Sequence, residues 1–260
     1  MTNKRILPFD AVDNFRDYGD YATQHGAHLA RGVLYRSAHH ARATDADRSR
    51  MGELGVAVIV DLRRRSERDR EPSRRPALFQ GDVIENDIGD VGVAPHLTFV
   101  MNNDLTPQNV RDFMIEEYRR IPFEPRHLDL YRRYFRALAE ARGPVLIHCA
   151  AGKDRTGILA ALTHHAVGVH PDDIAADYLL TNNPERMAAR LPQITQSIEE
   201  LSGKRPAPEA VMTVMGVDTV YLDNAFAAMD EHFGGVDAYL EHTLGVTPAV
   251  REALAERLLV

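Results

Sequence analysis

The stretch that decides the fold covers residues 145–162 and reads Val145-Leu146-Ile147-His148-Cys149-Ala150-Ala151-Gly152-Lys153-Asp154-Arg155-Thr156-Gly157-Ile158-Leu159-Ala160-Ala161-Leu162. Its first residues are apolar or β-branched up to His148 and predict a short strand. The seven residues from Cys149 to Arg155 predict a tight turn, because Gly152 lies within them. The Ala- and Leu-rich run at 158–166 then predicts a helix. A strand, a tight loop and a helix in this order bring backbone N–H groups and a helix N-terminus together around an anion.

The two ends of this loop carry a nucleophile and a cation. The helix N-terminus and the nearby Arg155 favour the thiolate of Cys149, which is the nucleophilic form of cysteine. The planar fork of Arg155 can bind two oxygens of a phosphate at once. We expect further phosphate contacts from the backbone N–H groups of Ala150, Ala151, Gly152, Lys153, Asp154 and Arg155. A thiolate held beneath a bound phosphoryl group predicts a phosphatase that works through a phosphocysteine intermediate.

The residues at 148–157 resemble the signature His-Cys-x-x-Gly-x-x-Arg-[Ser/Thr]-Gly of the cysteine-based protein tyrosine phosphatase superfamily at every fixed position. Lys153 and Asp154 are similar to the bacterial branch typified by mycobacterial protein tyrosine phosphatase B. Further segments match motifs of that branch, namely Asn14 to Gly19, Arg36-Ser37 and Asp61-Leu62-Arg63. The resemblance implies hydrolysis of phosphotyrosine in proteins, and also of phosphoserine, phosphothreonine or phosphoinositides, without a metal or other cofactor.

Two aspartates compete for the role of the acid that protonates the leaving oxygen. The superfamily places such an aspartate after a strand, and Asp87 holds that position, although the Trp and Pro that often precede it are absent. Asp154 lies inside the loop itself and is the alternative. The resemblance also implies that His148 positions the cysteine and that the Thr156 hydroxyl stabilises its thiolate. Asp61 and Arg63 follow a buried strand and are either pocket-edge groups or a structural ion pair.

The rest of the chain predicts an α/β fold with a mostly parallel sheet of about four to five strands. The strands are expected near residues 32–37, 56–63, 82–89 and 145–148. Helices are expected at 44–54, 127–141, 158–166, 170–180 and 185–201, and a helical C-terminal third at 217–233, 236–244 and 247–259. No Pro/Gly/Ser-rich linker divides the sequence, so we expect one phosphatase domain over residues 1–260.

Residues 90–126 are irregular and predict a lid or insertion over the active site. A helical patch within them carries an apolar face of Phe113, Met114, Ile115 and Tyr118, which would either cover the site or belong to the permanent core. A second unusual segment, residues 63–75, contains seven arginines among three acidic residues. It is interpreted either as a solvated, salt-bridged segment or as a basic rim for multiply phosphorylated substrates.

Composition narrows the class of protein. The net charge of −7 argues against a nucleic-acid-binding protein, and no stretch of about 20 apolar residues predicts membrane insertion. The single cysteine excludes an intramolecular disulfide and predicts a reducing compartment. Residues 1–10 lack the apolar run of a signal peptide, so we expect a cytoplasmic protein, or one exported without a cleaved signal.

Other chemistries have weaker support. The adjacent pairs His39-His40 and His164-His165 point their side chains apart, so no metal site is predicted. A phospho-binding module without turnover is disfavoured because both Cys149 and Arg155 are present. Arsenate reduction commonly needs additional cysteines, and the chain has only one. A buried structural cysteine leaves the Lys-Asp-Arg run at 153–155 unexplained.

Overall fold

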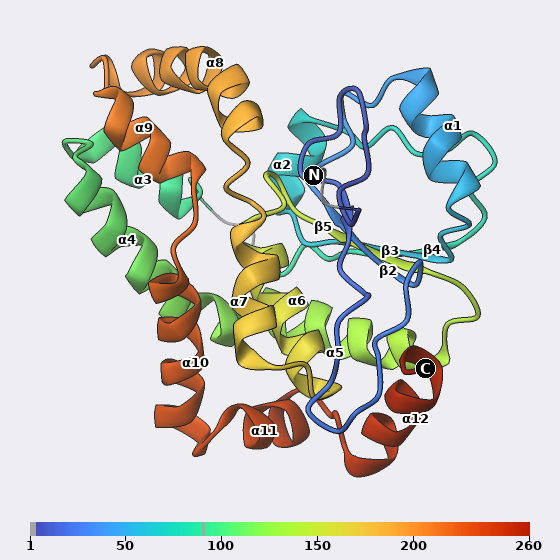
Figure 1. The fold of residues 1–260 in the computed structure, drawn as a ribbon. Helices are drawn as coiled ribbons and strands as arrows, with labels where there is room; N and C mark the ends of the chain where they lie inside the picture. Colours follow the sequence, from blue (N-terminus) through green and yellow to red (C-terminus); the bar gives the residue numbers. More distant parts are fainter. Residues whose placement is uncertain (1–3, 90–91) are drawn as a thin grey trace.

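The computed structural model describes residues 4–89 and 92–260 and contains a five-stranded sheet in the order β1-β2-β5-β3-β4 (Figure 1). β2 and β3 flank the central β5 and run parallel to it, β4 runs parallel to β3, and β1 is antiparallel to β2. This confirms the predicted mostly parallel α/β sheet. The strands are β1 (Arg16–Asp17), β2 (Leu34–Ser37), β3 (Val58–Asp61), β4 (Asp82–Ile84) and β5 (Val145–His148).

Side chains of the central strands alternate between two apolar cores, because successive strand residues point to opposite faces. In β5, Val145 and Ile147 join the larger core, whereas Leu146 joins the smaller one. Helices cover both faces, which explains why β2, β3 and β5 are buried along their whole length. The larger core is covered by α5 (Pro125–Glu140) and α6 (Asp154–Ala166), and the smaller by α1 (Asp45–Glu53) with the N-terminal segment.

Local sequence explains where several helices begin. Thr44 caps α1, because its hydroxyl accepts a hydrogen bond from the Asp47 backbone N–H at 3.0 Å, and the Asp47 carboxylate accepts from the Thr44 N–H in return. Proline occupies the first turn of α5 and of α7 (Pro171–Leu179), where its missing N–H would be unpaired in any residue. These helix starts agree with the sequence-based predictions to within about two residues.

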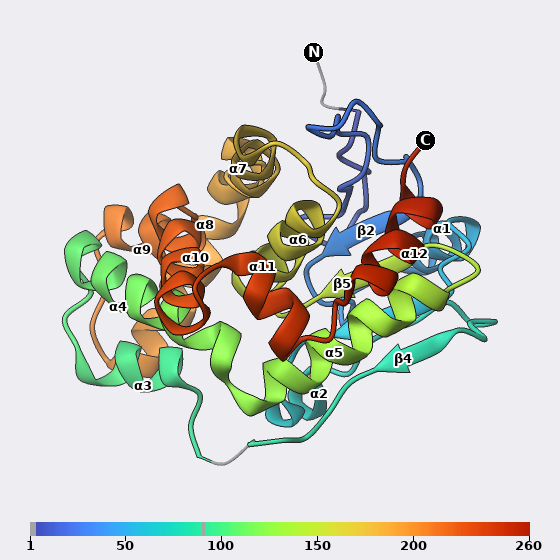
Figure 2. The same ribbon diagram turned by 90° about the horizontal axis from the view of Figure 1, so that it is seen from below.

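A group of helices lies to one side of the sheet in both views (Figures 1 and 2). A small apolar cluster of Val100, Ile198 and Val211 holds part of this group together. The group includes α3 (Pro95–Asn102), α4 (Pro107–Arg120), α8 (Pro184–Ser202), α9 (Pro208–Met215) and α10 (Thr219–Phe233). The predicted lid at 90–126 therefore contains α3, α4 and a short 3-10 turn, Ile121–Phe123. Residues 90 and 91 of that range lie outside the described residues.

The chain ends in a short helix α11 (Val236–Ala238), a π-helical turn (Tyr239–Thr243) and α12 (Pro248–Leu258), which packs against α5. The sequence predicts one helix over 236–244, and the structure divides it between α11 and the π-helical turn. α9 was not predicted. The six-residue α2 (Arg65–Arg70) lies within residues 63–75, where the charge pattern is compatible with a salt-bridged helix or loop. Within residues 4–89 and 92–260, none of the helices is long and apolar enough to cross a membrane.

Candidate active site

The loop that follows β5 lies at the centre of the carboxyl edge of the sheet. His148, the last residue of β5, is paired in register with Ser37 of β2 and Asp61 of β3. α6 begins at Asp154, so the turn from Cys149 to Lys153 leads directly into a helix N-terminus. Ligands of parallel α/β sheets bind at this edge. Cys149 is only 2% exposed, yet it lines a pocket of about 240 Å³ together with Ala150, Ala151, Lys153, Asp154 and Arg155.

The shape of this loop is fixed by contacts from outside it. Gly152 has φ +67°, and a Cβ at this position would lie 2.4 Å from the carbonyl of Ser37, so only glycine fits. Its carbonyl oxygen accepts from the Asn14 amide at 2.8 Å and from the Arg36 guanidinium at 3.1 Å. The Ala150 carbonyl accepts from the His39 N–H at 3.1 Å. The first amides of a helix have no intrahelical partner, so the amides at the start of α6 can serve an anion.

The guanidinium of Arg155 forms a bidentate ion pair with Glu67. Nη1 and Nη2 of Arg155 donate to the two carboxylate oxygens at 2.6 and 2.9 Å. Burial alone would raise the pKa of Glu67, but the charge of Arg155 and its hydrogen bonds outweigh this and hold the pKa below its usual range. Burial opposes the charge on Arg155 too, and the Glu67 carboxylate more than offsets it by raising the pKa of Arg155. The fork is therefore charged and preoriented before a phosphate binds.

Glu67 was missed by sequence reasoning, which treated residues 63–75 as uniformly solvated or as a rim. Its side chain is only 8% exposed, and one of its oxygens accepts from the Arg64 backbone N–H at 2.7 Å, which caps α2. The usual signal of such a cap is Ser or Thr at the first position, and here that position is arginine. Of the seven arginines in this segment, Arg64 lines the pocket.

Two buried arginines behind the loop share one carboxylate. Asp177 of α7 pairs with Arg16 at 3.1 Å and with Arg36 at 2.7 Å, and all three are about 1% exposed. Burial and the charge of Arg36 lower the pKa of Arg16 to about 10, while the two arginines outweigh burial and hold the pKa of Asp177 below its usual range. Arg16 also donates to Asn14 at 2.5 Å, so the cluster reaches the Gly152 carbonyl through Asn14 and Arg36.

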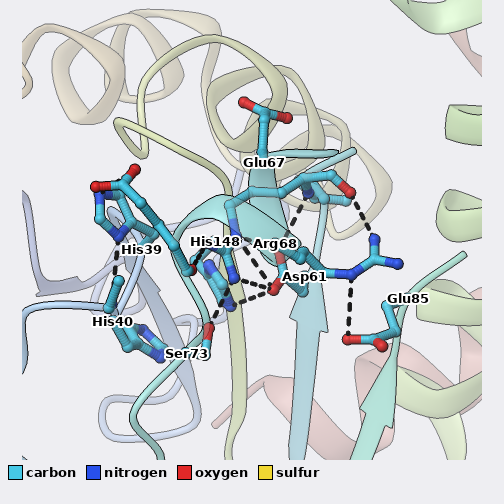
Figure 3. Close-up of polar contacts among 12 residues, drawn as sticks. His39, His40, Asp61, Glu67, Arg68, Ser73, Glu85 and His148 are labelled. Carbon is cyan, nitrogen blue, oxygen red and sulfur yellow. Dashed lines mark hydrogen bonds and ion pairs between the residues drawn. The ribbon is translucent and has the colours of Figure 1, made fainter. Parts of the chain in front are cut away.

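The structure places the two candidate acids in different environments. Asp154 lines the pocket with Cys149, and its Oδ1 accepts from the Tyr118 hydroxyl at 2.9 Å and from Lys153 Nζ at 2.7 Å. Asp87 is 54% exposed and pairs with Arg65 and Arg68 in a neighbouring shallow cleft. Figure 3 shows Arg68 directed toward Glu85 in that cleft. Among the described residues, the pocket above Cys149 is lined by Asp154 and not by Asp87.

The residues expected to support the cysteine lie behind the loop. Arg63 donates to Asp61 at 2.7 Å, and His148 Nε2 lies 3.6 Å from the same carboxylate. Figure 3 shows His148 between Asp61 and His40, whose ring centroid is 4.3 Å from that of His148. Burial outweighs the attraction of Asp61 and lowers the pKa of His148 to about 4, so the ring is neutral at pH 7. Asp61 and Arg63 form a buried ion pair and do not line the pocket.

The remaining predicted residues divide between core and pocket. Phe113 and Met114 line the pocket, and Phe113 stacks on Phe99 with ring centroids 4.2 Å apart. Ile115 packs on the large core, and Tyr118 is fully buried. Two of these residues therefore lie in the pocket wall, and two belong to the core. The hydroxyl of Thr156 is buried and has no hydrogen-bond partner in the described part of the chain.

Comparisons with known proteins agree with this geometry. A model of the tyrosine phosphatase family matches residues 7–260. A Cupriavidus necator protein provisionally named a tyrosine-protein phosphatase is 34% identical over 253 residues, covering 96% of this chain and 88% of its own. The triple specificity protein phosphatase PtpB of Mycobacterium tuberculosis is 35% identical over 260 residues, covering 87% of this chain and 90% of its own. The chain belongs to the tyrosine phosphatase family of bacterial phosphatases.

Proposed function

We propose that this phosphatase hydrolyses phosphotyrosine in proteins, and also phosphoserine and phosphothreonine, by a metal-independent route through phosphocysteine. The observation that carries the proposal is the pocket in which Cys149, the charged fork of Arg155 and the start of α6 meet. The mycobacterial relative is named a triple specificity phosphatase, which supports more than one class of substrate. A phosphoinositide is the alternative substrate, favoured by the cationic Arg64, Arg126 and Lys153 in the pocket wall.

In the first proposed step, the Cys149 thiolate attacks phosphorus in line with the ester bond. The new S–P bond forms as the P–O bond breaks, and Asp154 gives its proton to the leaving oxygen. Arg155 and the loop amides of residues 150–155 bind the three other phosphate oxygens, whose charge spreads in the transition state. Because Arg155 is already oriented by Glu67, little reorganisation accompanies substrate binding.

In the second proposed step, water attacks the phosphocysteine and its proton passes to Asp154. The S–P bond breaks, inorganic phosphate is released and the thiolate is restored. We assign the unpaired hydroxyl of Thr156 the role of stabilising that thiolate, and the neutral ring of His148 the role of holding the Cys149 backbone. Neither role adds a charge to the buried site. They are extended from the family resemblance and from the burial of the two side chains.

We also propose that residues 1–260 form one phosphatase domain in which residues 90–126 cover the active site. The family match over residues 7–260 and the pocket-lining positions of Phe99 and Phe113 support this organisation. Catalysis needs a reduced thiol, so we propose a cytoplasmic location, with export without a cleaved signal as the alternative.

The test is phosphate release from a matched panel of substrates without added metal. The panel contains phosphotyrosine, phosphoserine and phosphothreonine peptides, and inositol lipids with one or several phosphates, each assayed beside a Cys149→Ser control. We expect phosphotyrosine turnover that the control abolishes, and loss of at least 10³-fold in kcat for Arg155→Ala. Turnover by Cys149→Ser would contradict the mechanism. Binding without turnover by the native protein would favour a phospho-binding module.

A further inference from the structure

We propose that Tyr118 of α4 is a positioning residue that orients the carboxyl group of Asp154 for proton transfer. The inference rests on the proposed role of Asp154 as the acid and extends it to a residue outside the phosphate loop. In this inference α4 both lines the pocket and orients the proton donor.

The hydrogen bonds to the carboxyl group of Asp154 support this inference. The Tyr118 hydroxyl donates to Asp154 Oδ1 at 2.9 Å, and Lys153 Nζ lies 2.7 Å from the same oxygen. Within residues 4–89 and 92–260, both donors therefore reach Oδ1. The other oxygen, Oδ2, is left as the site from which a proton passes to the leaving group. Because Asp154 lines the pocket, this arrangement fixes which edge of its carboxyl group serves the substrate.

The hydroxyl of Tyr118 has a defined direction of donation. Burial, together with the negative charge of Asp154, raises the pKa of Tyr118 well above its usual value, so the hydroxyl keeps its proton at every working pH. Its oxygen lies 2.6 Å from the hydroxyl of Tyr178. Since the proton of Tyr118 is directed at Asp154, the Tyr178 hydroxyl acts as the donor between the two tyrosines. This short chain of hydrogen bonds runs from α7 through α4 to the loop.

The same hydrogen bond suits both protonation states of the acid. In the neutral carboxyl, Oδ1 is the carbonyl oxygen and accepts from Tyr118, while Oδ2 carries the proton. After transfer, Oδ1 of the carboxylate still accepts from Tyr118 and Lys153. No donor has to change its partner during the reaction, which keeps the reorganisation small.

The inference also links α4, which lines the pocket, to proton transfer by Asp154. Val110, Phe113 and Met114 of α4 line the pocket, and Tyr118 is fully buried on the same helix. Its ring packs edge-on against Tyr178, the neighbour of the Asp177 that pairs with Arg16 and Arg36. A displacement of α4 would therefore remove the hydroxyl from Asp154 while leaving the phosphate loop in place.

The test compares two leaving groups in the enzyme of residues 1–260. A poor leaving group such as phenol needs the proton from the acid, whereas the nitrophenolate ion leaves without it. For Tyr118→Phe we expect kcat/KM, which reports the step in which the leaving group departs, to fall about 10-fold for phenyl phosphate and to change by less than about twofold for p-nitrophenyl phosphate. The control is Tyr239→Phe, which removes another fully buried hydroxyl, bonded to the Pro122 carbonyl at 2.7 Å. We expect this control to change both rates equally or not at all.

Each outcome decides the inference. A loss of kcat/KM that is equal for the two substrates, or no loss, in a folded Tyr118→Phe enzyme overturns it. If that variant does not fold, Tyr178→Phe replaces it, with an expected loss of about threefold confined to phenyl phosphate, and equal losses again overturn the inference. Asp154→Asn tests the proposed acid separately. Dependence on the leaving group in Asp154→Asn but not in Tyr118→Phe overturns the positioning role alone, whereas its absence in Asp154→Asn overturns the acid assignment.

Discussion

The floor and the cover of the pocket are built from different interactions. The floor is held by buried charges, with Arg155 paired to Glu67, and with Arg16 and Arg36 paired to Asp177. The cover of α3 and α4 presents mostly apolar side chains, and a small cluster centred on three buried residues joins α3 to α8 and α9. The charged floor determines where a phosphate binds. The apolar cover determines which groups attached to that phosphate fit the pocket.

The largest expected effect is on the folding of the floor. Asp177→Asn leaves two buried guanidiniums without their carboxylate, and we expect the free energy of unfolding to fall by about 3 kcal/mol or more. Chemical denaturation of the variant and the native protein measures the difference. A loss below about 1 kcal/mol would show that the cluster does not stabilise the floor.

The contribution of Asp177 to the free energy of unfolding also depends on pH. The pKa of Asp177 is lowered in the folded chain, so the unfolded chain takes up the proton first as the pH falls. The stabilisation by Asp177 is fully present above its unfolded pKa of about 3.9 and is lost as the pH falls from there through the folded pKa. Native protein should thus lose stability more steeply than Asp177→Asn below about pH 4. Parallel pH curves would contradict the assignment.

The next effect concerns the orientation of Arg155. Glu67→Gln removes the negative charge that holds the fork, and we expect kcat/KM for p-nitrophenyl phosphate to fall by about 10- to 100-fold. Steady-state kinetics measures this change. Glu71→Gln is the matched control, since Glu71 follows α2 and pairs instead with His39 and Arg42. A rise in kcat/KM for Glu67→Gln would mean that Glu67 competes with the substrate for Arg155.

A smaller effect is expected from the outer support of the loop. Asn14 has φ +57° and donates to the Gly152 carbonyl, so Asn14→Gly removes the donor without straining the backbone. We expect about 10-fold weaker inhibition by vanadate, because the loop loses the hydrogen bond from Asn14, and Arg16 loses its acceptor there, while the hydrogen bond from Arg36 remains. Unchanged inhibition would show that Arg36 alone is sufficient.

The smallest effect is expected at the cover. Phe113→Ala removes an aromatic wall of the pocket, and we expect KM for aryl phosphates to rise by about three- to tenfold with little change in kcat. Phe233→Ala, at a residue that is 38% exposed and does not line the pocket, is the control. A large fall in kcat for Phe113→Ala would mean that the cover takes part in the chemistry more directly than its apolar surface indicates.

The floor was the more predictable part of the molecule. The strands were readable because buried parallel strands are apolar throughout, and the loop was readable because Gly152 and the helix that follows it have strong local signals. The residues that contact the loop from outside could not be predicted from the sequence. Glu67 lies in a segment rich in arginine, and only burial against Arg155 distinguishes it from Glu71.

Asp177 had a signal that could have revealed it. It lies three residues after Ile174 and one before Tyr178, so it shares the buried face of α7 with two apolar positions. A carboxylate on such a face needs a cationic partner, and Arg16 and Arg36 are far away in sequence. The cover has no comparable signal, because its apolar residues suit both a core and a pocket wall, and the structure uses them for both.

The carboxylate of Glu67 also offers a spectroscopic handle. One of its oxygens accepts at the same time from Arg155 and from the Arg64 backbone N–H, 2.6 and 2.7 Å away. A phosphate that draws Arg155 toward itself would redistribute the electron density on that oxygen. The ¹⁵N–¹H resonance of Arg64 would then shift with occupancy, so one amide at the rim reports on ligand titrations without a fluorophore or a chromogenic substrate.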